Sequence, residues 1–150
     1  MAGTPDLNTE YTAWVAPLSA INTPATAPTV TSVGIGVTAW VWRVEVRVPP
    51  GHAGYTGIAL TDSGSFIVPY ANPGPAWLIG DDDLLEYPLD KQVGLNLAFW
   101  SYNTSTDYQH GWQCRVIYTP MSAFTEQNDV IVTPDVADWA AAIEGTTGGS

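Results

Sequence analysis

The sequence predicts an all-β protein, an antiparallel β-sandwich of the jelly-roll or Greek-key kind. In residues 40–48, Trp and Val occupy the even positions, whereas Arg43, Glu45 and Arg47 occupy odd ones. A period of two is typical of a strand with one face in the core and one in water. Seven or eight apolar runs follow along the chain, joined by short turns and with no helical pattern between them. This spacing favours antiparallel sheets over βαβ units.

The sandwich domain is expected over residues 37–133. Its strands are expected at residues 40–48, 55–61, 66–68, 77–80, 84–87, 92–103 and 110–119, with a possible last strand at 129–132. The alternation places Trp42, Val44, Leu97 and Trp112 together in the core. Cys114 and Tyr118 alternate with Trp112 and are expected to face inward as well. Since Cys114 is the single cysteine, no intrachain disulfide is expected, and a buried thiol is chemically inert.

Residues 1–36 contain no Lys or Arg and are expected to form an extended N-terminal arm or linker. Residues 11–21 are mixed apolar and are compatible with pairing as an extended segment. Residues 22–32 are rich in Thr, Pro and Ala, and their prolines exclude a helix. We expect this arm to be mobile in the free protein and to lie on a partner's surface, with Thr23, Pro24 and Pro28 as contact residues.

Residues 134–150 are expected to form a short C-terminal helix and a flexible tail. Thr133, Pro134 and Asp135 are typical of a helix start. Apolar residues follow at positions 136, 139, 140 and 143, which is the spacing of one helical stripe. Because so short a helix is unstable alone, Trp139 is expected to dock on the sandwich or on a neighbouring subunit.

The charge excludes some classes of partner. Fifteen acidic residues against four basic ones give a formal net charge of −11. Phosphate contacts need clustered Lys and Arg, so neither nucleic acid nor an anionic membrane is an expected partner. We expect no signal peptide, since the first residues contain neither a basic segment nor an apolar run. Synthesis in a cytoplasm is therefore expected.

No catalytic motif is visible, and we expect no enzymatic activity and no cofactor. His52 and His110 stand alone in turn contexts. Asp81, Asp82 and Asp83 form the densest run of charge, and carboxylates on a loop are ligands that suit Ca²⁺. Their spacing lacks the pattern of a calcium-binding loop, and such runs are ordinarily solvated. Calcium at these three residues therefore stays an open alternative.

Two aromatic residues are expected to point out of the strand at 92–103. Trp100 and Tyr102 alternate with the inward Leu97 and Phe99. Large rings on a surface form a costly exposed patch, so we expect either a neighbouring subunit or the chain's own N-terminal arm to cover them. With Asn96 and Asn103 nearby, they suit either a protein contact or a platform on which a sugar stacks.

The pattern resembles the small accessory structural proteins of tailed bacteriophages. The resemblance is carried by the Thr/Pro-rich arm, by Val-Arg-Val-Pro-Pro-Gly-His-Ala-Gly-Tyr-Thr-Gly-Ile at 46–58, and by Trp-Leu-Ile-Gly-Asp-Asp-Asp at 77–83. It implies a non-enzymatic virion protein, of the capsid decoration or minor capsid type, that binds a preformed shell and is released by host lysis. The implied partners are the major capsid protein or other virion proteins, and further copies in a homo-oligomer. The alternative is a carbohydrate- or receptor-binding module associated with a tail or collar.

Overall fold

The computed structural model describes residues 9–70 and 75–124. This part of the chain forms ten strands and one helical turn at 121–124. The strands are β1 (Tyr11–Val15), β2 (Leu18–Ser19), β3 (Thr29–Ser32), β4 (Ala39–Val48), β5 (Thr56–Asp62), β6 (Ser65–Val68), β7 (Asp83–Val93), β8 (Leu97–Asn103), β9 (His110–Gly111) and β10 (Gln113–Pro120).

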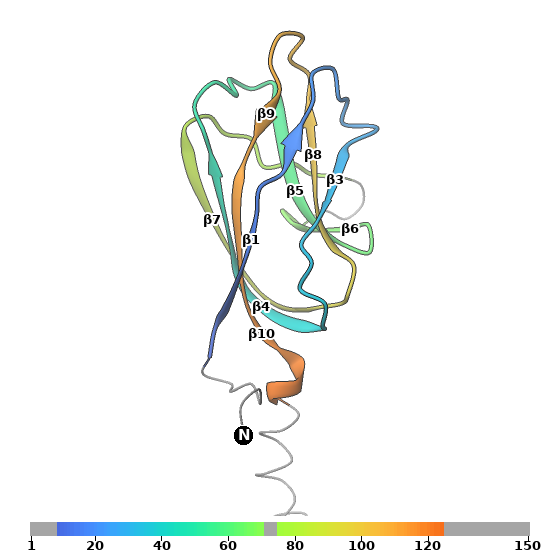
Figure 1. Ribbon diagram of the computed structural model, residues 1–150, viewed down its shortest axis with the longest axis vertical. Helices are drawn as coiled ribbons and strands as arrows, with labels where there is room; N and C mark the ends of the chain where they lie inside the picture. Colours follow the sequence, from blue (N-terminus) through green and yellow to red (C-terminus); the bar gives the residue numbers. More distant parts are fainter. Residues whose placement is uncertain (1–8, 71–74, 125–150) are drawn as a thin grey trace, which may run out of the picture.

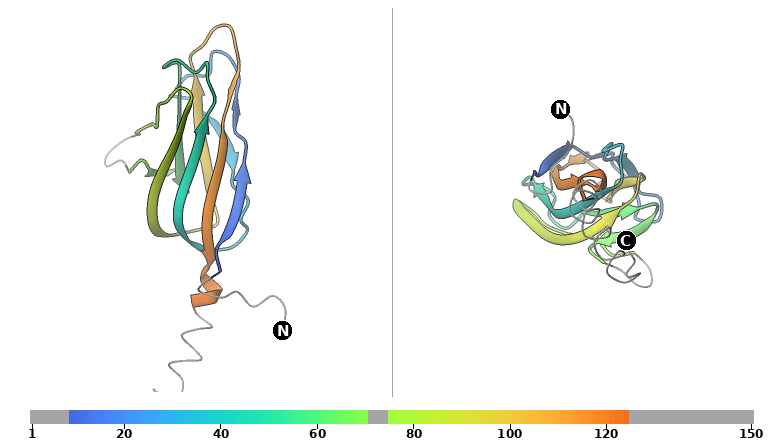
Figure 2. Two further views of the ribbon diagram at one scale, coloured as in Figure 1. Left: turned by 90° about the vertical axis from the view of Figure 1, so that its left-hand side faces the viewer. Right: turned by 90° about the horizontal axis from the view of Figure 1, so that it is seen from below.

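Eight of these strands form two four-stranded antiparallel sheets, with orders β1-β10-β4-β7 and β3-β8-β5-β6. Strands β2 and β9 form a small separate pair. The sheets pack face to face (Figure 1), and β7, β4, β10 and β1 lie side by side in the sheet that faces the viewer in the left view of Figure 2. The predicted antiparallel sandwich is therefore confirmed. The chain crosses between sheets at almost every connection, and this strand order is that of a jelly roll.

The core lies between the inner faces of the two sheets. Val44, Leu97 and Trp112 are buried there as predicted, together with Phe99 and Cys114. Burial raises the pKa of the Cys114 thiol, so the thiol stays protonated and unreactive near neutral pH. The core is built mainly of Val, Ile, Leu and aromatic side chains, as the alternation of the strands requires.

The predicted inward orientation of Trp42 is wrong, because a β-bulge changes the phase of β4. Against β10, Arg43 lies opposite Ile117 and Val41 opposite Tyr118, so Trp42 is an extra residue in β4. An extra residue at a bulge turns the side chains before it to the other face. Val41 and Val44 are consequently the buried ones, while Trp42 is half-buried. Its Nε1 donates a hydrogen bond to Thr119 Oγ1 at 2.9 Å.

The neighbouring strand β10 keeps its phase across this bulge. Strand β10 shifts register against β4 between Ile117 and Tyr118. Ile117 is buried, whereas Tyr118 is half-buried and stacks on Tyr11 of β1, with 5.7 Å between the ring centroids. Tyr118 lies opposite the buried Val41 and packs against the core, so its predicted inward orientation is confirmed.

The described part of the predicted arm belongs to the sandwich. Strand β1 pairs with β10, β2 with β9, and β3 with β8, so this segment supplies the edge strand of each large sheet. Its prolines do not prevent this, because Pro24 and Pro28 lie in the β2–β3 connection. The Ala27 N–H closes a turn there on the Pro24 carbonyl at 3.1 Å. The prediction of a detached arm therefore does not hold for residues 11–32.

Strand β7 continues through Pro88, where the sequence pattern predicted its end. A proline is tolerated there because β7 is an edge strand.

The predicted strand at 129–132, the predicted helix from residue 134 and Trp139 lie outside the described residues. Within residues 9–70 and 75–124, no helix is long and apolar enough to cross a membrane.

Candidate functional site

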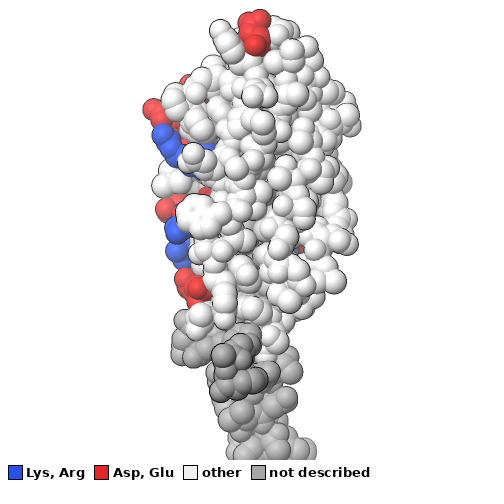
Figure 3. All heavy atoms as spheres, in the orientation of Figure 1, with Lys and Arg blue, Asp and Glu red and all other residues white. Residues whose placement is uncertain are grey.

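Charge is segregated between the two sheets. All Lys and Arg residues lie in one sheet, in strands β4, β7 and β10: Arg43, Arg47, Lys91 and Arg115. The strands of the other sheet carry a single charged residue, Asp62, whose Oδ2 accepts a hydrogen bond from the Gly94 N–H at 3.1 Å. Figure 3 shows charged atoms along the left side, whereas most of the visible surface is uncharged. Neutral surface costs less to desolvate than charged surface, which suits a contact with another molecule.

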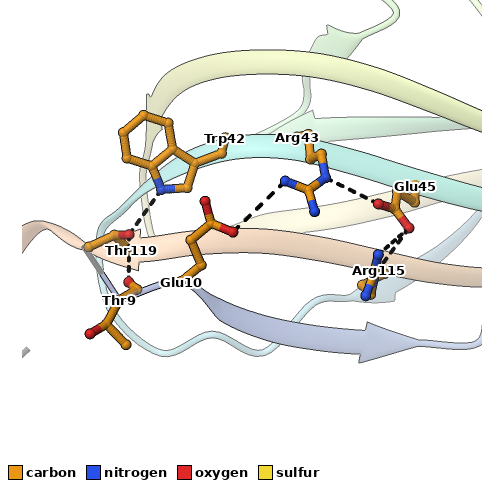
Figure 4. A network of polar contacts seen from close by, with 7 residues as sticks. All are labelled: Thr9, Glu10, Trp42, Arg43, Glu45, Arg115 and Thr119. Carbon is orange, nitrogen blue, oxygen red and sulfur yellow. Dashed lines mark hydrogen bonds and ion pairs between the residues drawn. The ribbon is translucent and has the colours of Figure 1, made fainter. Parts of the chain in front are cut away.

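Four charged side chains on the first sheet and its N-terminal flank form one network: Glu10, Arg43, Glu45 and Arg115 (Figure 4). Glu45, whose side chain is 12% exposed, binds Arg115 at 2.6 Å and Arg43 at 3.1 Å. Desolvation raises the pKa of Glu45, but hydrogen bonds from Arg115 and Arg43 outweigh it and lower the pKa overall. Arg43 also lies 3.9 Å from Glu10. This network stabilises the outer face of the sheet and leaves the neutral sheet as the better candidate for a binding surface.

The neutral sheet carries an aromatic cluster on its outer face. Trp100 and Tyr102 project from β8, and Phe66 of β6 and Trp77 lie edge-on against them. The ring centroids are 5.4 Å apart for Phe66 and Trp100, 5.3 Å for Phe66 and Trp77, and 5.0 Å for Trp77 and Tyr102. Edge-to-face pairs of this kind are favourable beyond the area that they bury.

The structure gives the two predicted contact residues different surroundings. Tyr102 lies over Gly57, which has no side chain. A Cβ atom at position 57 would come within 3.0 Å of Trp77 Cβ and closer still to the Tyr102 ring. Two backbone hydrogen bonds between Ile58 and Leu78, of 3.1 and 2.8 Å, hold the Trp77 segment on β5. Burial raises the pKa of Tyr102. Its own chain therefore covers Tyr102.

Trp100 instead lines an open groove of about 350 Å³. We call this feature the Trp100 groove; it is lined by Val30, Ser32, Thr61, Ser63, Gly64, Leu95, Asn96, Leu97, Ala98 and Trp100. Val30 lies opposite Trp100 in the β3–β8 ladder, and both Val30 and Leu95 are exposed. Apolar side chains thus flank the Trp100 ring on a surface without charge, so the groove is the candidate contact site.

The other predicted contact residues lie next to this sheet or outside the described chain. Thr23 exchanges two backbone hydrogen bonds with Asn103 at the end of β8, of 2.7 and 2.8 Å. Pro24 is exposed and Pro28 half-buried in the same connection. Thr23 thus has a structural role in anchoring the β2–β3 connection, and Pro24 is left on the surface.

The three consecutive aspartates are bound to protein donors. Asp81 Oδ1 accepts the N–H groups of Gly51 and His52 at 2.8 and 2.9 Å, and backbone hydrogen bonds, from Ala53 above all, lower its pKa. Asp82 pairs with Arg47 at 3.0 Å, and Asp83 accepts the Asp81 N–H at 2.9 Å. In the described parts of the chain, no group of three or more His, Cys, Asp or Glu side chains is arranged to hold a metal ion.

The structure brings the two histidines together. Their ring centroids are 4.6 Å apart, and His52 is buried. Its Nε2 lies 3.0 Å from the Gly111 carbonyl, which only accepts, so Nε2 carries the proton. Its Nδ1 then accepts from the Thr56 hydroxyl at 2.7 Å. The sequence did not predict this pair. His52 lies in the β4–β5 turn and His110 in β9, and these segments are distant in sequence and come together only because of the order of the strands.

Because His52 is buried, we expect the stability of the folded protein to depend on pH. Desolvation, followed by the neighbouring His110, lowers its pKa below the ordinary value of 6.5. The unfolded state therefore takes up a proton more readily, and the free energy of unfolding should fall as the pH drops below about 6.5. Urea melts between pH 5.5 and 8 measure this effect. Replacing His52 by Gln should flatten the profile more than His110→Gln does; identical profiles for both variants and the parent would contradict it.

The fold has a counterpart among solved structures. The chain is similar to a chain of the cyanophage Pam1 capsid asymmetric unit, with a TM-score of 0.52 and 15% sequence identity. The similarity covers 80% of this chain and 89% of that chain. No family model matches the sequence, and no curated protein matches it either. The protein shares the fold of a phage capsid chain.

Proposed function

We propose that the protein is a non-enzymatic structural protein of a virion, of the capsid decoration or minor capsid type. The observation that carries this proposal is the jelly-roll fold, which the chain shares over most of its length with a chain of a phage capsid. Jelly rolls are common in viral capsids. The paired charges on one sheet and the neutral, partly aromatic face of the other are consistent with a protein that binds a preformed shell.

The Trp100 groove is the surface we assign to shell binding. Burying Val30, Leu95 and the exposed part of Trp100 removes apolar surface from water, which stabilises a complex by roughly 25 cal/mol for each Å². No charge must be desolvated in the process, since the strands of this sheet carry only Asp62 at one end. The partner on the shell is the major capsid protein or another virion protein, and further copies of the chain are expected to join in a homo-oligomer.

Placing a carboxylate in the groove should abolish shell binding. Leu95 is 64% exposed, so Leu95→Asp should leave the fold intact, but it buries a charge at the interface, which is costly. We expect at least a tenfold loss of copies per particle in a co-sedimentation assay. The matched control is Leu84→Asp, at a similarly exposed position (57%) on β7 of the charged sheet, which should bind normally. Equal incorporation of both variants would contradict the assignment of the groove.

The alternative function, binding of a carbohydrate or receptor at a tail or collar, also rests on an observation. The Trp100 groove contains Asn96 as well as an indole face, and these groups suit a sugar. A glycan array probed with the purified protein separates the two functions. A specific glycan signal that Trp100→Ala removes, together with normal particle incorporation of that variant, would favour the alternative.

A further inference from the structure

The β4–β5 turn and the β8–β9 loop lie at the end of the molecule opposite to the two ends of the described chain (Figure 1), and residues of both line a further hollow. It has a volume of about 340 Å³ and shares no residue with the Trp100 groove. The β4–β5 turn and the β8–β9 loop form it. We call it the distal hollow; its lining residues are Gly51, Tyr55, Thr104, Ser105, Thr106, Asp107, Tyr108 and His110.

The β8–β9 loop is held in one shape by the buried Asn103. The Asn103 Nδ2 donates to the carbonyls of Ser19 and Tyr108 at 3.2 and 2.8 Å, and Oδ1 accepts the Ser105 N–H at 2.9 Å. Ser105 Oγ accepts the N–H groups of Asp107 and Tyr108 at 3.2 and 3.3 Å. A loop tied in this way keeps its side chains in position before a ligand arrives, which reduces the entropy cost of binding.

A second set of bonds joins this loop to the β4–β5 turn. Thr104 donates to the Tyr55 carbonyl with both its backbone N–H and its hydroxyl, each at 2.9 Å. Tyr55 in turn donates its N–H to the His52 carbonyl at 2.8 Å. The two walls of the hollow are therefore fixed relative to each other, with Tyr55 on one wall and Tyr108 on the other.

The lining groups have the chemistry that a sugar requires. Tyr55 and Tyr108 are both exposed, and an aromatic face packs against the C–H groups of a pyranose ring. Around them stand the exposed Thr106 hydroxyl, the Asp107 carboxylate and the His110 imidazole, and the Thr104 hydroxyl, which donates to the Tyr55 carbonyl, can still accept a hydrogen bond. These groups donate and accept hydrogen bonds, and so match ligand hydroxyls in either sense.

Other ligand classes fit less well. The Asp107 carboxylate in the hollow and the net charge of −11 disfavour an anion, such as a phosphate or an acidic sugar. A metal ion would find only the carboxylate of Asp107 and the ring of His110 there, fewer ligands than a stable site needs. We propose that the distal hollow is a binding site for a neutral saccharide. This inference goes beyond the proposed virion function and stands whether or not the Trp100 groove binds a shell.

Saturation-transfer NMR on the full-length protein tests the proposal. The probes are maltose, cellobiose, lactose and N,N′-diacetylchitobiose as neutral disaccharides, with sialyllactose as the acidic comparison. We expect transfer to at least one neutral disaccharide and a weaker signal from sialyllactose. Tyr108→Ala should reduce the signal at least tenfold, because the variant loses the most exposed ring of the hollow.

The control variant is Tyr70→Ala. Tyr70 is 69% exposed, close to the 71% of Tyr108, and lies outside the distal hollow. Neither substitution removes a buried group, so both variants should melt like the parent. Transfer to none of the four neutral disaccharides would overturn the proposal. A signal that survives Tyr108→Ala, or that Tyr70→Ala removes equally, would overturn it as well.

Discussion

Replacing Phe99 by alanine should lower the free energy of unfolding by about 3–5 kcal/mol. Phe99 is 1% exposed and is among the largest fully buried side chains of the described chain. It lies in the middle of β8, between Leu60 of β5 and Thr31 of β3 in the ladders. Truncation therefore opens a cavity between the sheets that strands on either side prevent from closing. Urea denaturation followed by tryptophan fluorescence measures the loss.

The comparison variant is Trp42→Ala, in which more side-chain volume is removed from the outer face. Trp42 is half-buried beside Trp40 and Phe124, with ring centroids at 6.1 and 6.5 Å. The variant loses one hydrogen bond and contacts that are partly exposed to water. We therefore expect its free energy of unfolding to fall by no more than about 2 kcal/mol. A larger loss for Trp42→Ala than for Phe99→Ala would contradict the bulge and return Trp42 to the core.

Replacing Asn103 by leucine should cost at least about 3 kcal/mol, since three hydrogen bonds of a fully buried side chain are lost. Each backbone group left without its partner costs roughly 1–3 kcal/mol. Leucine has a similar size, so the effect comes from lost polar contacts rather than from a cavity. The β8–β9 loop should loosen at the same time, and its amide hydrogens should exchange faster.

Thr106→Ala is the control in the same loop, because Thr106 is exposed and, among the described residues, its side chain makes a single long hydrogen bond, of 3.5 Å to Asp107. It should unfold within about 0.5 kcal/mol of the parent. Asn103→Leu with unchanged stability and unchanged amide exchange would show that the loop is held by its backbone alone.

The neutral face is already present in the sequence, but scattered. No Asp, Glu, Lys or Arg occurs in residues 11–38, 63–80 or 94–106. These segments are far apart along the chain, and the lack of Lys and Arg in the first contributes to the prediction of an arm. Only the jelly-roll strand order sets β3, β5, β6 and β8 side by side and turns separate uncharged segments into one surface. The sequence alone therefore predicted Trp100 as a contact residue, but it did not predict that Val30 and Leu95 lie beside Trp100.

The sequence by itself determined the all-β class, most strand positions and the inward set of Val44, Leu97, Phe99 and Trp112. It could do so because a two-residue period is a local property of each strand. Only the tertiary structure decided four other features. These are the outward orientation of Trp42, the pairing of residues 11–32, the cover of Tyr102 by Trp77, and the contact of His52 with His110. Each of these depends on a register shift or on contacts between residues distant in sequence, and local periodicity carries no information about either.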